Sequence, residues 1–578
     1  MRLKNWHCAA LLFIAVMAAY FFTLSAGFNS VDDLKRVNWL DNAGGLDVVR
    51  LFFPNGRSYY YRPLGTLTFL LDRDLWGSSP SFIHLENILI HFGSALMVFL
   101  LTRRLASILG IFSLVPALGA ALLFVWHPLA AEAVCWVSGR YDLLACFFLL
   151  VTVWLLLPRL QNGGKGLAAW SMLSLLMACL AKEVAVFALP GLLWLVLFSA
   201  GRKPFFTALH ERFAVLCFPV LAVTGYFVLR HVATARDSGV QTALKGVVAV
   251  GDYDLLDKLR VALKVYGFYF KKLLVPWPLN FGIVQISDYY VIFGLLLAMV
   301  LLWLLWRRDL LSSLAIMAFC VLSPALLVVF GKMAWTPLAE RYLYSSLALL
   351  APVVALWLTQ IFMRTDSVNR YRLALACGMV LLVFYGATVH RAWIWQDNER
   401  LFRDTAVKSP DFDPARAELA SALLRKGKAD EAEAVLQTLQ QDGRSASYIV
   451  DDLNLAQRLM SRGELDAARE LLLPLLELNP KKRHEVLQHL LKLNALALSK
   501  AVGESDKELL RQESLTWLEE QLRLRPDPFT HYRIGKMQLA LGESDAAILS
   551  FQQALQRAPV DAFYREAAKK MLHKLQER

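Results

Sequence analysis

The feature that most constrains this chain is a series of apolar runs, each near the length of about 20 residues that an α-helix needs to cross a bilayer. Of its 578 residues, 57% are hydrophobic, which is too apolar for a soluble multidomain protein. The runs fill the chain to about residue 391, and we count about eleven of them. The sequence therefore predicts an all-α, polytopic membrane protein. The runs lie at residues 9–26, 82–101, 109–126, 142–158, 166–181, 184–199, 212–230, 289–306, 310–330, 342–361 and 371–391.

Basic residues gather in short segments between these runs. By the positive-inside rule the segments face the cytoplasm, as do Arg2 and Lys4 before a first helix that we expect to be retained. The formal net charge of +13 then reflects topology, and we expect no nucleic-acid partner. The segments 27–81, 127–141 and 231–288, and everything after 391, fall on the extracytoplasmic (periplasmic) side of an inner membrane. The basic segments are 103–104, 159–165, 202–203, 307–308 and 364–372.

Residues 258–272 carry a charge every few positions, and we do not count them as a span. We expect an amphipathic helix on the outer membrane surface that ends at Pro276. Counting it as a span would move Arg307 and Arg308 to the outer side, against the positive-inside rule.

After about residue 391 the sequence becomes charged and rich in alanine and leucine. We predict a membrane domain at 1–391, a linker at 392–410 and a soluble domain at 411–578. Three windows of the last domain fit the 34-residue pattern of tetratricopeptide repeats, and a degenerate fourth lies at 485–526. Such repeats stack into an α-solenoid whose concave surface binds peptides. The aligned positions are Ala420, Leu423, Gly427, Ala432, Leu436, Leu439, Ala456, Leu459, Gly463, Ala468, Leu472, Leu475, Pro480, Gly535, Gly542, Ala547, Phe551, Ala554 and Pro559, with a capping helix from Ala562.

The acidic pair Asp32 and Asp33 lies a few residues beyond the first apolar run. Carboxylates at the outer mouth of a span are costly to bury and therefore indicate a functional site. The structural alternative is an N-cap for the next helix. One carboxyl of the pair could have a raised pKa while the other stays ionised, or both could hold a divalent cation. The seven cysteines show no CxxC spacing, so we expect neither a disulfide framework nor a zinc site.

Polar residues also mark the next span. Arg62 stands in the first outer loop, and the helix after it carries His84, Asn87 and His91. The last three are three and four positions apart, so they share one helix face that points inward from the outer side. A lone histidine in a helix is usually a satisfied core residue, whereas three polar residues on one stripe favour a binding role.

The second outer loop is too polar for a simple turn. His127, Glu132, Arg140 and Asp142 fall within sixteen residues of one another. Charged and imidazole groups gathered at the outer end of a span are typical of a binding site for a polar substrate.

Three further charged residues interrupt or open apolar runs. Lys182 and Glu183 are adjacent, and an ion pair between them would suffice as an explanation. Arg341 opens a span at the outer surface, where its guanidinium can clamp a phosphate with paired hydrogen bonds. The alternative for Arg341 is snorkelling to the membrane surface.

Six short motifs occur in a fixed order along the chain. They are Asp-Asp at 32–33, Tyr-Arg-Pro-Leu at 61–64, His-Leu-x-Asn-x-x-x-His at 84–91, His-Pro at 127–128 with Ser-Gly-Arg-x-Asp-Leu-Leu-Ala at 138–145, Lys-Glu at 182–183 and Arg-Tyr-Leu-Tyr at 341–344. Together with the repeats, this order resembles the transmembrane-and-tetratricopeptide O-mannosyltransferases and their bacterial relatives. One departure is Ser345-Ser346, where that family commonly has Leu-Pro-Ser.

The resemblance implies a glycosyltransferase of the GT-C fold, which moves a sugar from a polyprenyl-phosphate donor to a protein hydroxyl on the extracytoplasmic face. It assigns the catalytic base to Asp32 or Asp33, and we expect Asp32, which is nearer the membrane. Arg341, with Arg140 or Lys182, becomes the candidate partner of the donor phosphate. The repeats would then recruit the protein acceptor.

Two other functions fit the same sequence. A GT-C transferase could act on a lipid or glycan acceptor and use its repeats to recruit an assembly partner. A non-enzymatic scaffold could display the repeats outside the membrane, although one span would suffice for an anchor. Deletion of the repeats separates the two enzymes, because only the protein-modifying enzyme would lose its acceptor while it still turns over the donor.

Overall fold

The computed structural model describes residues 5–42, 47–53, 61–162, 166–198, 204–234, 254–331, 336–428, 430–435, 450–478, 482–558 and 564–576. Its elements are α-helices and short 3-10 helices, and within these ranges extended segments pair only at one bridge between Ile283 and Leu338. The predicted all-α class is confirmed. Some residues used above lie outside the described ranges: Arg2, Lys4, 163–165, 202–203, Leu436, Leu439, Pro480, Pro559 and Ala562.

The chain forms two compact units. The first unit contains Met1–Asn29 and Leu40–Phe412, and the second, here called the repeat unit, contains Ser30–Trp39 and Asp413–Arg578. Helix α2 (Asp33–Asn42) therefore begins in the repeat unit, although it follows the first apolar run in the sequence.

The helices of the first unit identify a multi-pass membrane protein, as predicted. Eight helical segments of the described chain are long and apolar enough to cross a membrane, and a ninth is added if the bent pair Val115–Trp126 and Pro128–Cys135 is one span. Each of the eleven predicted runs contains a helix, but the helix of the run 109–126 begins only at Val115 and the runs at 166–181 and 184–199 form shorter helices, so fewer than eleven reach spanning length. The α-helices of this unit are α1 (Asn5–Tyr20), α3 (Val48–Phe52), α4 (Pro63–Trp76), α5 (Pro80–Ile108), α6 (Val115–Trp126), α7 (Ala131–Cys135), α8 (Arg140–Asn162), α9 (Gly166–Ala181), α10 (Leu189–Phe198), α11 (Phe205–Thr234), α13 (Leu255–Leu274), α14 (Tyr290–Arg307), α15 (Leu310–Leu322), α16 (Pro324–Gly331), α17 (Tyr344–Arg364), α18 (Ser367–Trp395) and α19 (Asn398–Lys408).

Helix α5 lies at the centre of the first unit, where it packs against α1, α6, α8 and α17. Its buried face continues inward from His84 through Ile88 and Ala95 to Val98. This arrangement carries the polar residues at its N-terminal end into the interior, next to the loops that connect α6 with α8. The fold therefore brings polar motifs of two connecting segments to one end of the helical bundle.

Helices α13 and α14 pack closely because a glycine of each helix faces the other. A Cβ atom at Gly267 would overlap the carbonyl oxygen of Tyr290, and one at Gly294 would overlap that of Leu263. Small residues allow such close approach between helix backbones in membranes. The predicted amphipathic helix is α13, which ends just before Pro276 as expected. Its position on the outer membrane surface stays a prediction.

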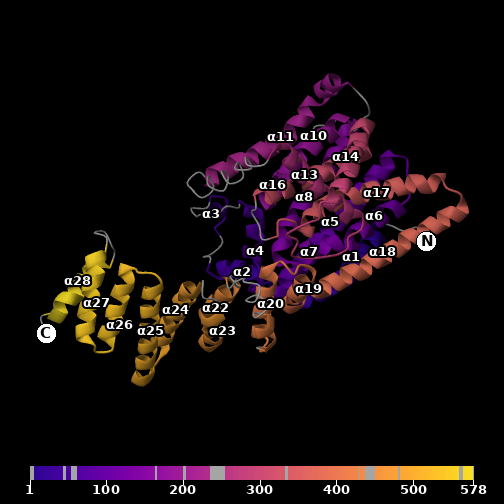
Figure 1. Cartoon of the computed structure of the whole chain (residues 1–578). Coiled ribbons are helices and arrows are strands. Elements are labelled where there is room, and N and C mark those ends of the chain that lie inside the picture. Colours follow the sequence, from indigo (N-terminus) through magenta and orange to yellow (C-terminus); the bar gives the residue numbers. More distant parts are fainter. Residues whose placement is uncertain are drawn as a thin grey trace. The chain divides into compact units, whose positions relative to one another are not determined.

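The repeat unit is a solenoid of packed helices, which Figure 1 shows as a row from α22 to α28, coloured orange to yellow. Each helix in this row packs against the next. Gly427, Gly463 and Gly542 all have φ values of 74° to 84°, the left-handed region that glycine adopts easily at the end of a helix. Because these three glycines occupy the same position of the predicted windows, their shared geometry supports the repeat. The helices are α20 (Asp413–Arg425), α22 (Val450–Arg462), α23 (Leu465–Leu478), α24 (Arg483–Lys500), α25 (Glu504–Leu524), α26 (Pro528–Ala540), α27 (Ser544–Arg557) and α28 (Arg565–Gln576).

Candidate functional site

Charged side chains of the first unit gather where helices begin or break. Arg62 immediately precedes α4, and Asp142 lies in the first turn of α8. Lys182 stands at the break between α9 and the 3-10 turn Glu183–Ala188. Arg341 lies in the 3-10 turn Glu340–Leu343 that leads into α17. Helix ends are the places where an apolar helix can carry a charged group without burying it in the middle of the bilayer.

Two ion pairs connect the first three elements. Lys182 Nζ donates to both carboxylate oxygens of Asp142, at 2.7 Å each. Arg62 Nε donates to Glu183 Oε2 at 2.7 Å, and Arg62 Nη2 pairs with Oε1 of the same carboxylate. The sequence allowed an ion pair between the adjacent residues Lys182 and Glu183. In the structure each of them instead pairs with a residue on another element.

A third pair joins Arg341 to Glu132 on α7. Arg341 Nη1 pairs with Glu132 Oε1, and the backbone N–H of Arg341 donates to Oε2 at 3.2 Å. The guanidinium also lies over the ring of Trp136, with Cζ at 4.8 Å from the ring centroid, a favourable cation–π distance. An arginine side chain has five N–H donors. Among the described contacts of Arg341, one of these donors forms a hydrogen bond, the one to Glu132. The guanidinium therefore retains donors for a further anion.

The electrostatics of Lys182 indicate that the three cations are neighbours. Burial lowers the pKa of Lys182, the carboxylate of Asp142 raises it, and the positive charges of Arg62 and Arg341 lower it again. The three pairs balance positive and negative charge, so the cluster is neutral as a whole. A phosphate at this position would contact three cations. Each cation could exchange a hydrogen bond to its carboxylate for one to the phosphate.

Arg140, in contrast, is committed to the interior of the first unit. Its side chain is fully buried. Its Nε donates to Asn87 Oδ1 at 2.8 Å, its Nη2 donates to the carbonyl oxygen of Ile83 at 2.9 Å, and its Nη1 pairs with Asp72. The hydrogen bonds of Arg140 therefore lie inside the fold, and a role for Arg140 or Lys182 at a donor phosphate stays a prediction.

Asp72 is a buried partner that sequence analysis missed. Burial raises the pKa of Asp72 to about 7, a hydrogen bond with Glu86 raises it as well, and the charge of Arg140 lowers it. Glu86 Oε2 lies 3.2 Å from Arg140 Nη1, so two carboxyl groups share one guanidinium. In the sequence Asp72 stands in the later half of α4 beside Arg73 and Asp74, and its meaning depended on an arginine 68 positions away.

The three candidate histidines are buried, two on α5 and one at the end of α6. His91 Nδ1 shares a hydrogen bond of 2.8 Å with the hydroxyl of Tyr344, and His84 Nε2 lies 3.3 Å from the carbonyl oxygen of Gly27. His127 Nδ1 accepts from the backbone N–H two residues later at 3.4 Å. These contacts hold the rings in place, and a binding role for the histidines stays a prediction.

Asp32 and Asp33 belong to the repeat unit. Asp33 is buried in the first turn of α2, whereas Asp32 is exposed. In the same unit, Ser30 Oγ donates to Glu418 Oε2 at 2.7 Å and so ties the segment before the pair to α20. The two neighbours therefore have different surroundings, and the catalytic role of the pair stays a prediction.

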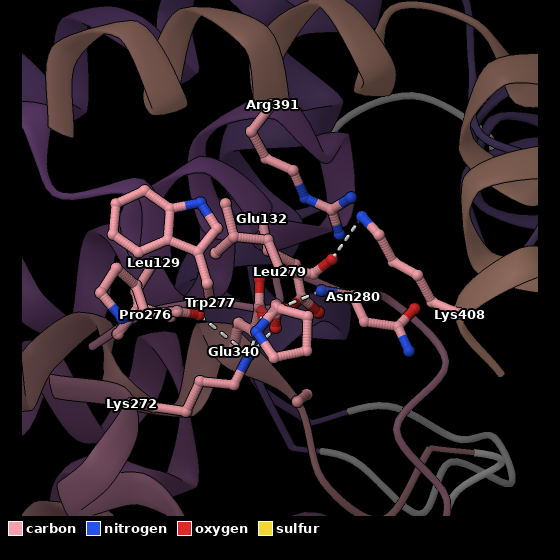
Figure 2. Close-up of polar contacts among 12 residues, drawn as sticks. Leu129, Glu132, Lys272, Pro276, Trp277, Leu279, Asn280, Glu340, Arg391 and Lys408 are labelled. Atoms are coloured by element: carbon pink, nitrogen blue, oxygen red, sulfur yellow. Dashed lines mark hydrogen bonds and ion pairs between the residues drawn. The ribbon is translucent and has the colours of Figure 1, made fainter. Parts of the chain in front are cut away.

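A second buried cluster lies beside Glu132, and Figure 2 shows its main members. Lys272 Nζ pairs with Glu340 Oε1 at 2.8 Å, and both side chains are nearly inaccessible to solvent. Arg391 pairs with Asp404 at 3.0 Å, while its buried Nε and Nη2 have no hydrogen-bond partner among the described residues. Sequence analysis noted Lys272 only as the end of the segment 258–272 and did not single out Glu340, because nothing local indicates that the two residues meet.

The described residues contain no group of three or more His, Cys, Asp or Glu side chains that could hold a metal ion. The carboxylates of Glu132, Asp142 and Glu183 each face a cationic side chain instead. Each of these three acids is therefore neutralised by a basic side chain.

Comparison with known proteins gives one matching family model and several curated relatives. A tetratricopeptide repeat family model matches residues 530–561. The chain is 30% identical over 191 residues to Protein O-mannosyl-transferase Tmtc1 of Drosophila melanogaster, which covers 32% of this chain and 21% of that protein. It is 33% identical over 163 residues to Protein O-mannosyl-transferase TMTC2 of Mus musculus (27% and 19%) and 36% identical over 92 residues to TMTC1 of Homo sapiens (16% and 10%).

The matched part of the chain spans about a fifth or less of the length of these curated relatives. The chain is thus a relative of the transmembrane-and-tetratricopeptide O-mannosyltransferases, and the predicted resemblance is confirmed.

Proposed function

We propose that this protein is a membrane glycosyltransferase of the GT-C type that transfers a sugar from a polyprenyl-phosphate donor to a hydroxyl group of a protein. The reaction takes place on the extracytoplasmic side of the inner membrane. The relatives are named protein O-mannosyl-transferases, which supports mannose as the sugar to test first.

The observation that carries this proposal is the cluster of three ion pairs at the helix ends of the first unit. A lipid-linked donor keeps its chain in the bilayer and presents its phosphate at the rim, where cationic side chains must meet it. Arg341 and Lys182 are the two cations of the cluster that we assign to the phosphate. When the bond between sugar and phosphate breaks, negative charge develops on the phosphate, and these cations stabilise it.

The acceptor hydroxyl must lose its proton as it attacks the anomeric carbon. We assign this general base to Asp32, with Asp33 as its support in the first turn of α2. The bond from the acceptor oxygen to the sugar forms while the bond to the phosphate breaks, and the proton passes to the carboxylate. Arg62 and Glu183 complete the donor site, together with Glu132 and Asp142, which neutralise the cations in the absence of donor.

The repeat unit supports a protein as the acceptor. Tetratricopeptide solenoids bind extended or helical segments of other proteins along their concave surface. We propose that this unit recruits the acceptor protein and raises its local concentration at the membrane.

The test is sugar transfer by the full-length chain in membranes from polyprenyl-phosphate mannose to exported proteins, read by mass spectrometry of intact acceptors. Removal of a general base lowers turnover about a hundredfold or more. We expect this loss in Asp32→Asn and a smaller loss in Asp33→Asn, at equal membrane levels of both variants. A strong loss in Asp33→Asn alone would reverse the assignment. Near-normal transfer by both variants would remove the pair from the mechanism.

A further inference from the structure

The turn that carries Arg341 is held at three successive residues just before it. Leu338 forms the antiparallel bridge with Ile283. The backbone N–H of Ala339 donates to the hydroxyl of Tyr269 at 3.2 Å, and that hydroxyl donates back to the carbonyl oxygen of Ala339. The conformation at Arg341 therefore depends on α13 and on the loop 276–283.

Glu340 is the third of these residues, and its carboxylate is fixed by two donors. Its Oε1 accepts from Lys272 Nζ at 2.8 Å and from the backbone N–H of Asn280 at 3.0 Å. Lys272 also donates to the carbonyl oxygens of Pro276, at 3.1 Å, and of Pro278. A lysine has three N–H donors, so every donor of Lys272 is used to join Glu340 to this loop (Figure 2).

The loop 276–283 is held from its other side by α19 and the residues that follow it. Lys408 Nζ donates to the carbonyl oxygen of Leu279 at 2.8 Å. Asn280 Nδ2 donates to Ser409 Oγ at 2.7 Å, and Ser409 Oγ donates to the carbonyl oxygen of Gly282 at 2.6 Å. Ser409 thus bridges two points of the loop with one hydroxyl.

The packing around Gly282 is tight as well. A Cβ atom built on Gly282 would lie 2.5 Å from a ring carbon of Phe412 and 2.7 Å from Thr405 Cγ2. No side chain fits there without movement of the loop or of α19. The loop is therefore clamped between Glu340 on one side and the last residues of the first unit on the other.

We propose that Glu340 is a positioning residue for Arg341, and that Ser409 acts on the same guanidinium through Asn280 and Glu340. The contacts form one continuous path from Ser409 to Asn280, to the carboxylate of Glu340 and then to the adjacent Arg341. Ser409 lies four residues before Asp413, where the repeat unit resumes in the sequence. The path therefore connects the end of the chain segment that leads to the repeats with the donor phosphate.

This inference rests on the proposed function, because it assigns Arg341 to the phosphate. The inference goes beyond the proposed function because it assigns control of donor binding to residues that do not contact the donor. These residues are Glu340, Lys272, Asn280 and Ser409. A guanidinium that is misplaced by about 1 Å can lower the rate by up to about a hundredfold. Loss of the clamp should therefore lower kcat/KM for the donor without any change at Arg341 itself.

The experiment is a double-mutant cycle with the full-length chain and polyprenyl-phosphate mannose as the donor. The variants are Glu340→Gln, Arg341→Lys and the double variant, and kcat/KM for the donor is measured for each. We expect Glu340→Gln to lower kcat/KM about tenfold or more. We also expect Arg341→Lys to have less effect in the Glu340→Gln background than in the wild type, since a misplaced side chain has less to lose.

Two further variants separate positioning from unfolding. Lys272→Met combined with Glu340→Gln removes both buried charges. The unfolding midpoint, which Glu340→Gln alone lowers, should therefore return to the wild-type value in this double variant. Its kcat/KM for the donor should stay low. Ser409→Ala should lower kcat/KM about threefold with no change in folding. The matched control is Asp288→Asn. Asp288 is an exposed acid outside α13 that pairs with Arg260 and Lys264 on α13, the helix that also carries Lys272, and its substitution should leave kcat/KM unchanged.

Independent effects in the cycle, or full recovery of kcat/KM in the double-charge variant, would overturn the positioning role. Failure of the proposed function looks different. In that case the wild type transfers no sugar, or Arg341→Lys alone leaves donor use unchanged, and the inference falls with it.

Discussion

The pair formed by Lys182 and Asp142 allows one prediction to be worked out in full. Each side chain is 10% exposed, and both carboxylate oxygens lie 2.7 Å from the ammonium nitrogen. Replacement of Lys182 by Met keeps the volume but leaves the carboxylate of Asp142 buried without a partner. Breaking a buried ion pair in this way costs about 3–5 kcal/mol. We expect the free energy of unfolding of Lys182→Met to fall by this amount.

The opposite variant, Asp142→Asn, should cost less, about 1–2 kcal/mol. Burial and the charges of Arg62 and Arg341 already lower the pKa of Lys182, and Asp142 is the main group that raises it. Without that carboxylate the pKa falls further, and Lys182 can give up its proton instead of staying charged in the interior. The two single variants should therefore differ by about 2 kcal/mol, although they break the same pair.

The assay has two parts, equilibrium denaturation in mixed micelles and sugar transfer from polyprenyl-phosphate mannose. The double variant Lys182→Met/Asp142→Asn contains no unpaired charge, so its stability should return to within about 1 kcal/mol of the wild type. Transfer should stay low in the double variant, because the cation that meets the phosphate is gone. Recovery of transfer together with stability would refute this reasoning and leave Lys182 with the single task of neutralising Asp142.

The topology, the Asp72 site and the close packing of α13 against α14 can each be tested separately. A reporter that is active only in the cytoplasm, fused after Arg578, should be silent, because the basic loops place the end of the chain outside; a bright fusion would contradict this topology. The folded-state pKa of Asp72 is raised to about 7, so its contribution to stability is complete below about pH 4 and is lost as the pH rises through 7. The unfolding midpoint of the wild type should therefore fall between about pH 4 and 7 more steeply than that of Asp72→Asn, and parallel profiles would show that Arg140 keeps this carboxyl ionised throughout. Gly294→Ala should destabilise by about 1–3 kcal/mol, because its methyl group would overlap the carbonyl oxygen of Leu263 on α13, whereas Gly378→Ala, with open space around it, should not.

Much of the fold could be predicted from the sequence because the forces that decide it are local. A run of about 20 apolar residues must form a helix in a bilayer, since every backbone polar group needs a partner within the segment. The repeats were equally readable, because Gly427, Gly463 and Gly542 recur at one position and each closes the same turn. The sequence was less reliable for the number of spans. In the run 184–199, for example, the apolar residues do not reveal that the first part forms a 3-10 turn and leaves only a short α-helix.

Several residues of the candidate site, such as Lys182, Glu183 and Arg341, were also visible in the sequence, because charged groups that interrupt or open apolar runs are conspicuous. What the sequence did not contain was their pairing. Lys182 and Glu183 are neighbours in the chain, yet they bind Asp142 and Arg62 on other elements. Arg140 looked as suitable for a phosphate as Lys182, but its hydrogen bonds lie inside the fold.

The reason for this division is the range of the interactions. Hydrophobic length and turn chemistry act over a few residues, so the amino-acid sequence by itself determined the helical membrane class, the loops that carry the site residues and the repeats. An ion pair depends on the distance between side chains of different elements, and that distance follows from how the helices pack. The tertiary structure alone therefore decided that Arg341 faces Glu132 and that Glu340 is clamped by Lys272.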